Sequence, residues 1–545
     1  GNTVLVLCPP EAAPPLLYLA ELSGDGGALP PGALNVVTGP FPDLCRSLRA
    51  HPGVAAVTFL GTTQVPEVQA LAWGSPCRGP RAGWARGGRV VVVVLDSADL
   101  DGAAAAIVGA FPWGGCVVLA QEGVLAPLER RLRARLGGLR VGDPLDPGTD
   151  VGPLPPAVPH PEGLLGVPWP AGSSCVCVSP PSQVFQPLLP PGDRFYPPTL
   201  ITGVAPTSRC LREPAAGPVL VLLPVRSPGE AVAVASGLPL TATAAVWAQD
   251  VTTALDTAER LPQGLVWLNA LNLLDPSGGC AGGAEETTLE EALREFGRPP
   301  WEQPPKPEEP LSPEEAVPDP EDTELAGAVL AARAAAPGWG RLPGASRARG
   351  LRGAAAALGG TRGTPGGNDG DNGRLQEALL RWAAHAEQMG GAVQEVPGGR
   401  ALVTRRPLGV VGVAWSWPRP LSLELLPPAL ALGNSVVVVA PPGAAGAALR
   451  LRKALVAAGL PGGALAVLPG GSRGSGAKLA RHHPDGLWLC GADTDWTSAL
   501  SVPRVWGVPE RVLGASGLDP PLGATRELEL RCTRPHCLWV PAGAP

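Results

Sequence analysis

The sequence predicts an α/β protein built on parallel sheets, part of which is present a second time in shortened form. Short apolar runs alternate with helical stretches over residues 1–75 and again over residues 90–275, an order typical of parallel strands joined by helices. The run Val90–Leu95 is apolar at every position, as expected of a parallel strand covered on both faces. A motif at the start of the chain recurs far along it. The length of 545 residues allows several domains.

The first stretch is predicted to form one parallel, doubly wound sheet. Its apolar runs have the length of strands and end near glycine, and longer stretches of helical character separate them. The predicted elements, in order, are a strand at Val4–Leu7, a helix at Pro14–Leu22, a strand at Leu34–Val37, a helix at Pro42–Ala50 and a strand at Val54–Leu60.

The second stretch repeats the α/β alternation with longer apolar runs, which predicts a second layered unit with a sizeable core. The predicted strands are Val90–Leu95, Val117–Ala120, Val219–Leu223, Ala244–Trp247 and Leu265–Asn269, and the predicted helices are Asp99–Ala110, Leu128–Leu136 and Val251–Leu261.

Two segments read as connections rather than as packed structure. Residues 299–321 are rich in proline and glutamate and hold little that could be buried, which predicts an extended linker. Residues 359–372 are rich in glycine, which predicts a flexible loop. With 73 glycines and 68 prolines, the chain as a whole has the composition of a protein with many loops.

An internal repeat indicates duplicated domains. The opening segment, residues 1–10, recurs as residues 433–442, and residues 32–39 recur as residues 463–470. Two copies this far apart favour a duplicated domain over a solenoid, which needs a short period. Within the second copy we expect Val436–Val439 to be a buried parallel strand with Pro407–Val413 paired beside it, the whole docked against the first copy.

Charge, hydropathy and cysteine content exclude several classes of protein. The net charge is −6 and no block of basic residues is present, so we do not expect nucleic acid as a partner. No apolar run reaches the length of a membrane span. The eleven cysteines are scattered without the spacing of a metal site, which predicts free thiols in a reducing compartment and a cytoplasmic protein.

A resemblance to a known family rests on an ordered series of motifs. Residues 84–89 read Trp-Ala-Arg-Gly-Gly-Arg and lead into the apolar run and then Ala-Asp-Leu-Asp at residues 98–101. This resembles the aldehyde dehydrogenase signature, Leu-Glu-Leu-Gly-Gly-Lys before a buried strand and a helix start. Further motifs follow in the family's order: Gly-Asn-Thr at residues 1–3, Phe-Leu-Gly-Thr-Thr at 59–63, Gly-Pro-Val at 217–219, Val-Trp-Leu-Asn at 266–269, Pro-Ser-Gly-Gly at 276–279 and Arg-Glu-Phe-Gly at 294–297.

The resemblance also implies a domain plan. The chain is similar to aldehyde dehydrogenase family 16, in which one domain is followed by a reduced second copy, and we expect it to be truncated at its N-terminus. The implied parts are the remainder of a Rossmann-like NAD-binding domain at residues 1–86, an α/β catalytic-type domain at 87–298, a linker at 299–321 and a partial second copy at 322–545.

The family's catalytic residues are only partly present. The reaction needs a cysteine thiolate as nucleophile and a glutamate as general base. Cys116 is the candidate nucleophile, although the motif places it one position early and Val117 at the family's cysteine position. The alternative for Cys116 is a buried small hydrophobic residue. Ala85 stands where the resemblance puts the general base, and the oxyanion asparagine of the second copy is replaced by Pro418.

The NAD site implied by the resemblance is eroded as well. Glu11 stands at the position of the family's ribose acceptor, whereas Cys8 replaces the lysine that donates to the same ribose. Pro214 replaces the carboxylate that holds the nicotinamide ribose. Backbone positions that could still contact the cofactor are Gly39, Gly61 and Thr62.

Three functions stay open from the sequence. The first is a catalytically defective member of the family that binds or assembles with protein partners or with itself, and that binds NAD weakly or not at all. The second is NAD-dependent oxidation of aldehydes to carboxylic acids with Cys116 as nucleophile. In the third, the second copy supplies the front segment that the first copy lacks.

Overall fold

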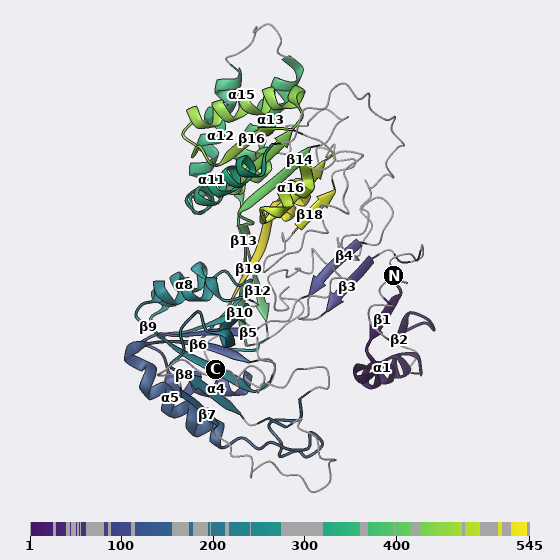
Figure 1. Ribbon diagram of the computed structural model, residues 1–545, viewed down its shortest axis with the longest axis vertical. Helices are drawn as coiled ribbons and strands as arrows, with labels where there is room; N and C mark the ends of the chain where they lie inside the picture. Colours follow the sequence, from purple (N-terminus) through teal and green to yellow (C-terminus); the bar gives the residue numbers. More distant parts are fainter. Residues whose placement is uncertain are drawn as a thin grey trace.

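The computed structural model contains two large sheets, each covered by helices, and two small two-stranded sheets (Figure 1). None of the described helices combines the length and the apolarity needed to cross a bilayer. The model describes residues 2–25, 29–39, 44, 51, 54, 56–60, 81–85, 89–110, 115–154, 174–177, 195–196, 198–212, 217–239, 241–273, 320–359, 369–396, 398–415, 426–470, 475–490, 511–514 and 525–541.

The larger sheet has ten strands and joins segments from both ends of the chain. Seven strands at its centre, from β19 to β8, run parallel, and antiparallel strands flank them on both sides. In sheet order the strands are β12 (Ala392–Val396), β13 (Gly399–Pro407), β19 (Thr533–Pro541), β11 (Leu265–Leu268), β10 (Thr241–Trp247), β5 (Arg89–Val94), β6 (Cys116–Gln121), β9 (Val219–Val225), β8 (Thr199–Thr202) and β7 (Ser174–Cys177).

Helices cover both faces of this sheet. The helices α4 (Leu100–Ala110) and α5 (Glu122–Gly137) pack on one face, and α8 (Pro228–Gly237) and α9 (Val251–Arg260) pack on the other. Because successive side chains of a strand point to opposite faces, the valines of β5 alternate between the two cores. Both faces being buried explains why these strands are apolar at almost every position.

The second large sheet lies in the C-terminal half and is parallel throughout. Its strands, in sheet order, are β16 (Leu465–Pro469), β15 (Ser435–Ala440), β14 (Val410–Trp415), β17 (Gly486–Cys490) and β18 (Arg511–Gly514). The helices α11 (Asp322–Gly340) and α16 (Ser475–Arg481) cover one face. The other face is covered by α12 (Gly344–Gly359), α13 (Asp369–Gln388), α14 (Leu426–Ala431), α15 (Pro442–Ala457) and α18 (Thr525–Cys532).

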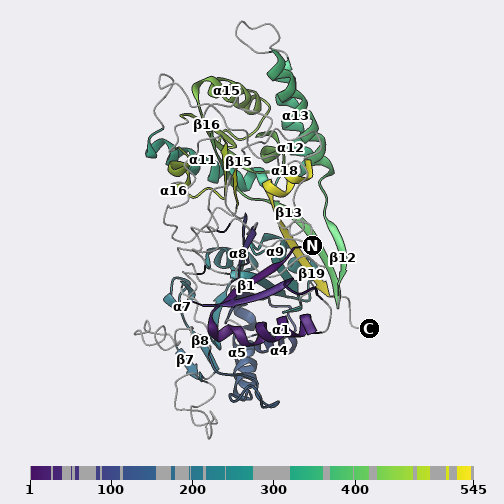
Figure 2. The same cartoon turned by 90° about the vertical axis from the view of Figure 1, so that its right-hand side faces the viewer.

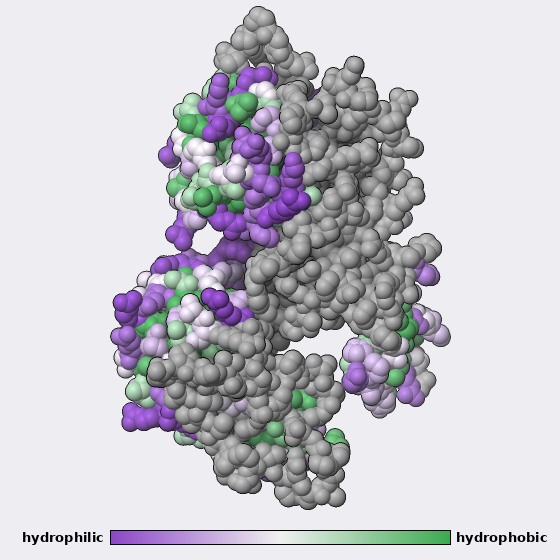
Figure 3. Space-filling view, in the orientation of Figure 1, coloured by the Kyte–Doolittle hydropathy of each residue, from purple (hydrophilic) through white to green (hydrophobic). Residues whose placement is uncertain are grey.

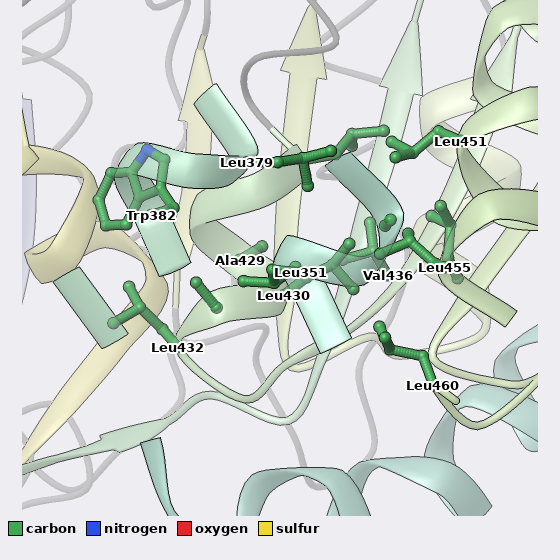
Figure 4. Packing of buried hydrophobic residues seen from close by; sticks show 14 of the residues in the cluster. Leu351, Leu379, Trp382, Ala429, Leu430, Leu432, Val436, Leu451, Leu455 and Leu460 are labelled. Atoms are coloured by element: carbon green, nitrogen blue, oxygen red, sulfur yellow. The ribbon is translucent and has the colours of Figure 1, made fainter. Parts of the chain in front are cut away.

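The core on that second face is made mainly of leucine and alanine. Figure 4 shows Leu351, Leu379 and Leu430, from three different helices, gathered near Val436 of β15. Trp339 of α11 donates a hydrogen bond from its indole N–H to the Leu430 carbonyl at 2.9 Å. The indole thus stays satisfied while its ring is buried.

The start of the chain forms the two small sheets. β1 (Val4–Cys8) and β2 (Leu34–Thr38) pair in parallel and are joined through the helix α1 (Ala13–Asp25). β3 (Ala56–Leu60) pairs in parallel with β4 (Arg81–Ala85). The expectation of one sheet through the first three predicted strands is therefore wrong, because β3 does not pair with β1 or β2. Figure 1 shows β1, β2 and α1 at the right of the molecule.

Most predicted strands and helices are confirmed within about two residues, and the differences lie in the connections. The segment predicted as a loop up to residue 372 ends earlier, because α13 begins at Asp369. The linker over 299–321 lies outside the described residues except at its end, where Glu321 caps α11. The predicted helix at Pro42–Ala50 also lies outside them, apart from Leu44. The strands β7 and β8 and the helix α8 were not predicted.

The two halves meet where three strands of the C-terminal half extend the ten-stranded sheet. Figures 1 and 2 show β13 and β19 running side by side from the upper body to the lower one. β19 pairs in parallel with β11, so that Trp267 lies opposite Trp539. The predicted docking of the second copy on the first is confirmed in this form, and so is the predicted pairing of β14 with β15. Pro407, however, ends β13 rather than beginning β14.

Candidate functional site

Cys116 lies inside the sheet and not on a loop. It is the first residue of β6, where it is paired with Val90 of β5 and Leu220 of β9. Its exposed fraction is 2%, and it belongs to the core cluster beneath α4 and α5. A side chain in this position contacts other core residues rather than a small molecule in solvent.

The electrostatic environment keeps the Cys116 thiol protonated. Burial raises its pKa to about 12, and the positive charge of nearby Arg89 offsets this only in part. At pH 7 a thiol with that pKa is ionised in only about one molecule in 10⁵. Since the thiolate is the nucleophile, both burial and pKa oppose a catalytic role for Cys116 in this conformation.

Arg89 is a buried cation that the motif comparison did not single out. It donates from Nη1 to the Cys210 carbonyl at 2.9 Å and from Nη2 to the Leu211 carbonyl and, at 3.4 Å, to the Pro239 carbonyl. Burial lowers the pKa of Arg89 to about 10, which still leaves it charged at neutral pH. Its donors therefore hold backbone carbonyls around α7 (Arg209–Arg212). The signal in the sequence was its place directly after the Gly-Gly pair.

Ala85 and Cys116 lie on different sheets. Ala85 is the last residue of β4 and is paired with Leu60 of β3, whereas Cys116 belongs to the ten-stranded sheet. An alanine side chain has no group that could take up a proton. Val117, the residue at the family's cysteine position, is wholly buried in β6.

Two of the predicted cofactor positions lie at one edge of the β1–β2 sheet. Glu11 is in a single 3-10 turn (Pro10–Ala12) after β1 and is exposed, and Gly39 follows β2. Ligands of parallel α/β sheets bind outside the carboxyl ends of the strands, so the location suits a nucleotide. A Cβ on Gly39 would lie 3.4 Å from the Leu44 side chain. Gly61, Thr62, Pro214 and Pro418 lie outside the described residues.

The polar groups at this edge fit NAD only in part. Glu11 offers one exposed carboxylate that could accept hydrogen bonds from a ribose. Cys8, at the place of the family's lysine, is 5% exposed and carries no ammonium group. Among the described residues, no group of three or more His, Cys, Asp or Glu side chains could hold a metal ion.

The contact between the two halves has the best-developed polar network that spans them. Cys537 of β19 donates its backbone N–H to the Gly264 carbonyl at 2.7 Å. Arg406 of β13 reaches the end of α9, where it donates to the Leu261 carbonyl at 2.8 Å and to the Glu259 carbonyl. Helix carbonyls at this position have no partner within the helix, so a cation is favourable there. Burial lowers the pKa of Arg406 to about 10.

A histidine is buried in the same contact. Burial lowers the pKa of His536 in β19 to about 3, and the positive charges of Arg406 and Arg534 act in the same direction. His536 is 3% exposed and is therefore neutral over the physiological pH range. No reading of the sequence alone pointed to Arg406 or His536, because their importance depends on a strand pairing with the other half.

Comparison with known proteins agrees with this fold. The model of the aldehyde dehydrogenase family matches residues 1–299 and 368–487. Betaine aldehyde dehydrogenase 2 of Rhizobium meliloti is 32% identical over 306 residues, which is 55% of this chain and 61% of that protein. Phenylacetaldehyde dehydrogenase of Pseudomonas fluorescens is 33% identical over 294 residues, which is 51% of this chain and 55% of that protein.

A solved NAD-dependent aldehyde dehydrogenase from Sinorhizobium meliloti is 27% identical, with a TM-score of 0.47, and the match covers 55% of this chain and 63% of that one. The chain thus spans about three fifths of the length of the relatives it matches. The family model covers more than half of the residues in two separate stretches. The chain belongs to the aldehyde dehydrogenase family.

Proposed function

We propose that this chain is a catalytically defective aldehyde dehydrogenase whose role is to bind and assemble with protein partners. The observation that carries the proposal is the position of Cys116, a protonated thiol at the start of a central strand with 2% of its surface exposed. An aldehyde cannot reach such a sulfur without opening the sheet, and the sulfur that it would meet is not a thiolate.

The remaining catalytic groups support the same conclusion. Ala85 supplies no base, and the nearest cation, Arg89, spends its donors on backbone carbonyls. Loss of nucleophile and base together removes on the order of 10⁶ of rate in enzymes of covalent mechanism. We therefore expect turnover to be absent or very weak.

The contact between the halves supports an assembly role. A strand and an arginine of the C-terminal half close the edge of the ten-stranded sheet, so that the duplicated parts pair within one chain. We propose that the two halves are tandem copies of one domain, as in family 16, divided by the linker at residues 299–321. The buried free thiols among the described residues, Cys116 included, fit a cytoplasmic protein.

NAD binding is proposed to be weak or absent. The family's lysine is replaced by buried Cys8 and its nicotinamide-ribose carboxylate by Pro214, which removes two charged contacts. Hydrogen bonds to charged groups contribute roughly 1.5–3 kcal/mol each, so affinity falls by two orders of magnitude or more relative to a complete site. Glu11 is the one charged contact that remains among the described positions.

The alternative is residual NAD-dependent aldehyde oxidation through Cys116. One feature favours it: the charge of Arg89 acts to lower the Cys116 pKa, as a cation beside a catalytic thiol does. This route needs β6 to separate from a neighbour so that the sulfur meets solvent. The two functions differ in whether Cys116 reacts in the native protein.

The test combines turnover with thiol labelling. We expect no NADH formation with a broad panel of aldehydes. Iodoacetamide followed by mass spectrometry is expected to leave Cys116 unmodified in the native chain and modified in urea. Labelling reports on burial even if turnover is absent for another reason. Steady NADH formation that Cys116→Ser abolishes, or fast native labelling of Cys116, would overturn the proposal.

A further inference from the structure

The two parallel units of this chain share their strand pairings. In the first unit β1 pairs with β2 from Val4 and Leu34 onward, and in the second β15 pairs with β16 from Val436 and Leu465. Each pair is joined by one helix, α1 in the first and α15 in the second. The sequence repeat therefore corresponds to the same strand–helix–strand structure in both places.

The correspondence extends to the next pair of strands. β3 pairs with β4 from Ala56 and Arg81, and β17 pairs with β18 from Gly486 and Arg511. The number of residues between the paired positions is the same in both units, and all the pairs are parallel. Four strands of the first unit thus have a counterpart in the second.

One strand of the second unit has no counterpart among the described residues of the first. β14 lies at the centre of the five-stranded sheet, between β15 and β17. In the first unit, β1 pairs with β2 and β3 pairs with β4, and no described strand joins the two pairs. The edges of β1 and β3 that correspond to the β14 side of β15 and β17 therefore define a place for one strand.

Burial in β1 agrees with an uncovered edge. Every residue of β15 is buried, whereas Val4 is 51% and Leu5 44% exposed. The helix α1 likewise exposes Leu17, Tyr18 and Leu22 by half or more of their surface or close to it. Hydrophobic side chains are visible on the surface of this unit in Figure 3, at the lower right. An exposed apolar edge of this kind marks an interaction site.

The direction of the backbone amides identifies the groups that face this place. Val4 donates its N–H to Ala33 beside β2 at 2.8 Å, as Val436 donates to Ala464 beside β16. Because successive amides of a strand point to opposite sides, the N–H groups of Leu5 and Leu7 point away from β2. Their counterparts in β15 face β14, where the preceding residue, Ser435, donates to Gly409 at 2.9 Å.

We propose that β1 and β3 bind one apolar strand with the chemistry of β14, inserted in parallel between them. The ligand is an extended segment of small and branched apolar residues, as in Val410–Trp415. The chain's own β14 does not fill the place, since both of its edges are paired in the second sheet. The proposal holds whether or not the chain oxidises aldehydes.

The test uses a fluorescent peptide with the sequence of residues 405–415, whose two arginines keep it soluble, added to the full chain. We expect saturable binding by anisotropy. The variant Leu5→Pro removes an amide that faces the incoming strand and leaves the β1–β2 bonds in place, and we expect it to weaken binding about tenfold or more. The matched control Leu5→Thr keeps the amide and should bind like the parent chain.

Hydrogen exchange shows where the peptide binds. The amides of Leu5 and Leu7 should gain protection on binding, while that of Val6, already bonded toward β2, should not change. A peptide with proline at positions 411 and 412 should not bind. Equal affinity of Leu5→Pro and Leu5→Thr, or no binding, would refute the proposal. Protection of Leu5 and Leu7 that depends on the concentration of the chain alone would assign the place to a second copy and also overturn it.

Discussion

The two parallel units of this protein have the same local structure but different burial. Val437 of β15 is fully buried, whereas Leu5, at the corresponding position of β1, is 44% exposed. β15 has a strand on each side and helices on both faces, while β1 has β2 and α1 alone among the described elements. A strand can therefore be specified by its own residues, but its contribution to stability depends on what covers it.

The largest expected effect comes from placing a charge at this pair of positions. Val437→Asp leaves an unpaired carboxylate in the core and should destabilise the protein by more than about 4 kcal/mol, enough to prevent folding of the second unit. Leu5→Asp should cost less than about 1 kcal/mol, because its side chain already meets water. Urea denaturation followed by circular dichroism measures both. Similar losses in the two variants would show that the first unit is covered after all.

A pH dependence is expected from the contact that covers the edge of the ten-stranded sheet. Because His536 has a pKa of about 3 when folded and an ordinary pKa near 6.5 when unfolded, the unfolded chain binds the extra proton between these values. Stability should therefore be fully present above pH 6.5 and fall by about 1.4 kcal/mol for each unit of pH below it. His536→Phe should flatten this slope in denaturation series from pH 7 to 4.5. A control, His482→Asn, changes a histidine outside the contact and should leave the slope unchanged, and equal slopes in all three proteins would contradict the assignment.

A smaller effect is expected from the arginine in the same contact. Arg406→Ala removes donors from two carbonyls at the end of α9 and should cost about 2 kcal/mol. Arg226→Ala breaks an exposed ion pair with Glu230 and should cost less than about 0.5 kcal/mol. Urea midpoints compare the two. If the two losses are equal, the contact between the halves contributes no more than a surface ion pair.

Much of the candidate site could be located from the sequence, but not evaluated. The motifs placed Cys116 beside a predicted strand and Glu11 and Gly39 after two others, and the structure has them in those places. Whether Cys116 is a nucleophile depends on its exposure and pKa, which follow from β5, β9 and the helices around it. Arg89 acquires its role only because Cys210 and Pro239, distant in the chain, present carbonyls to it.

The sequence by itself determined the α/β class, most strands and helices, and the repeat that joins residues 1–10 to 433–442. These features depend on apolar periodicity and on turns, which act between residues close in the chain. The tertiary structure alone decided that β19 pairs with β11, that Arg406 caps α9, and that β1 and β3 lie in separate sheets. Every apolar strand offers two similar edges, and which edges meet depends on the packing of the whole chain rather than on either strand.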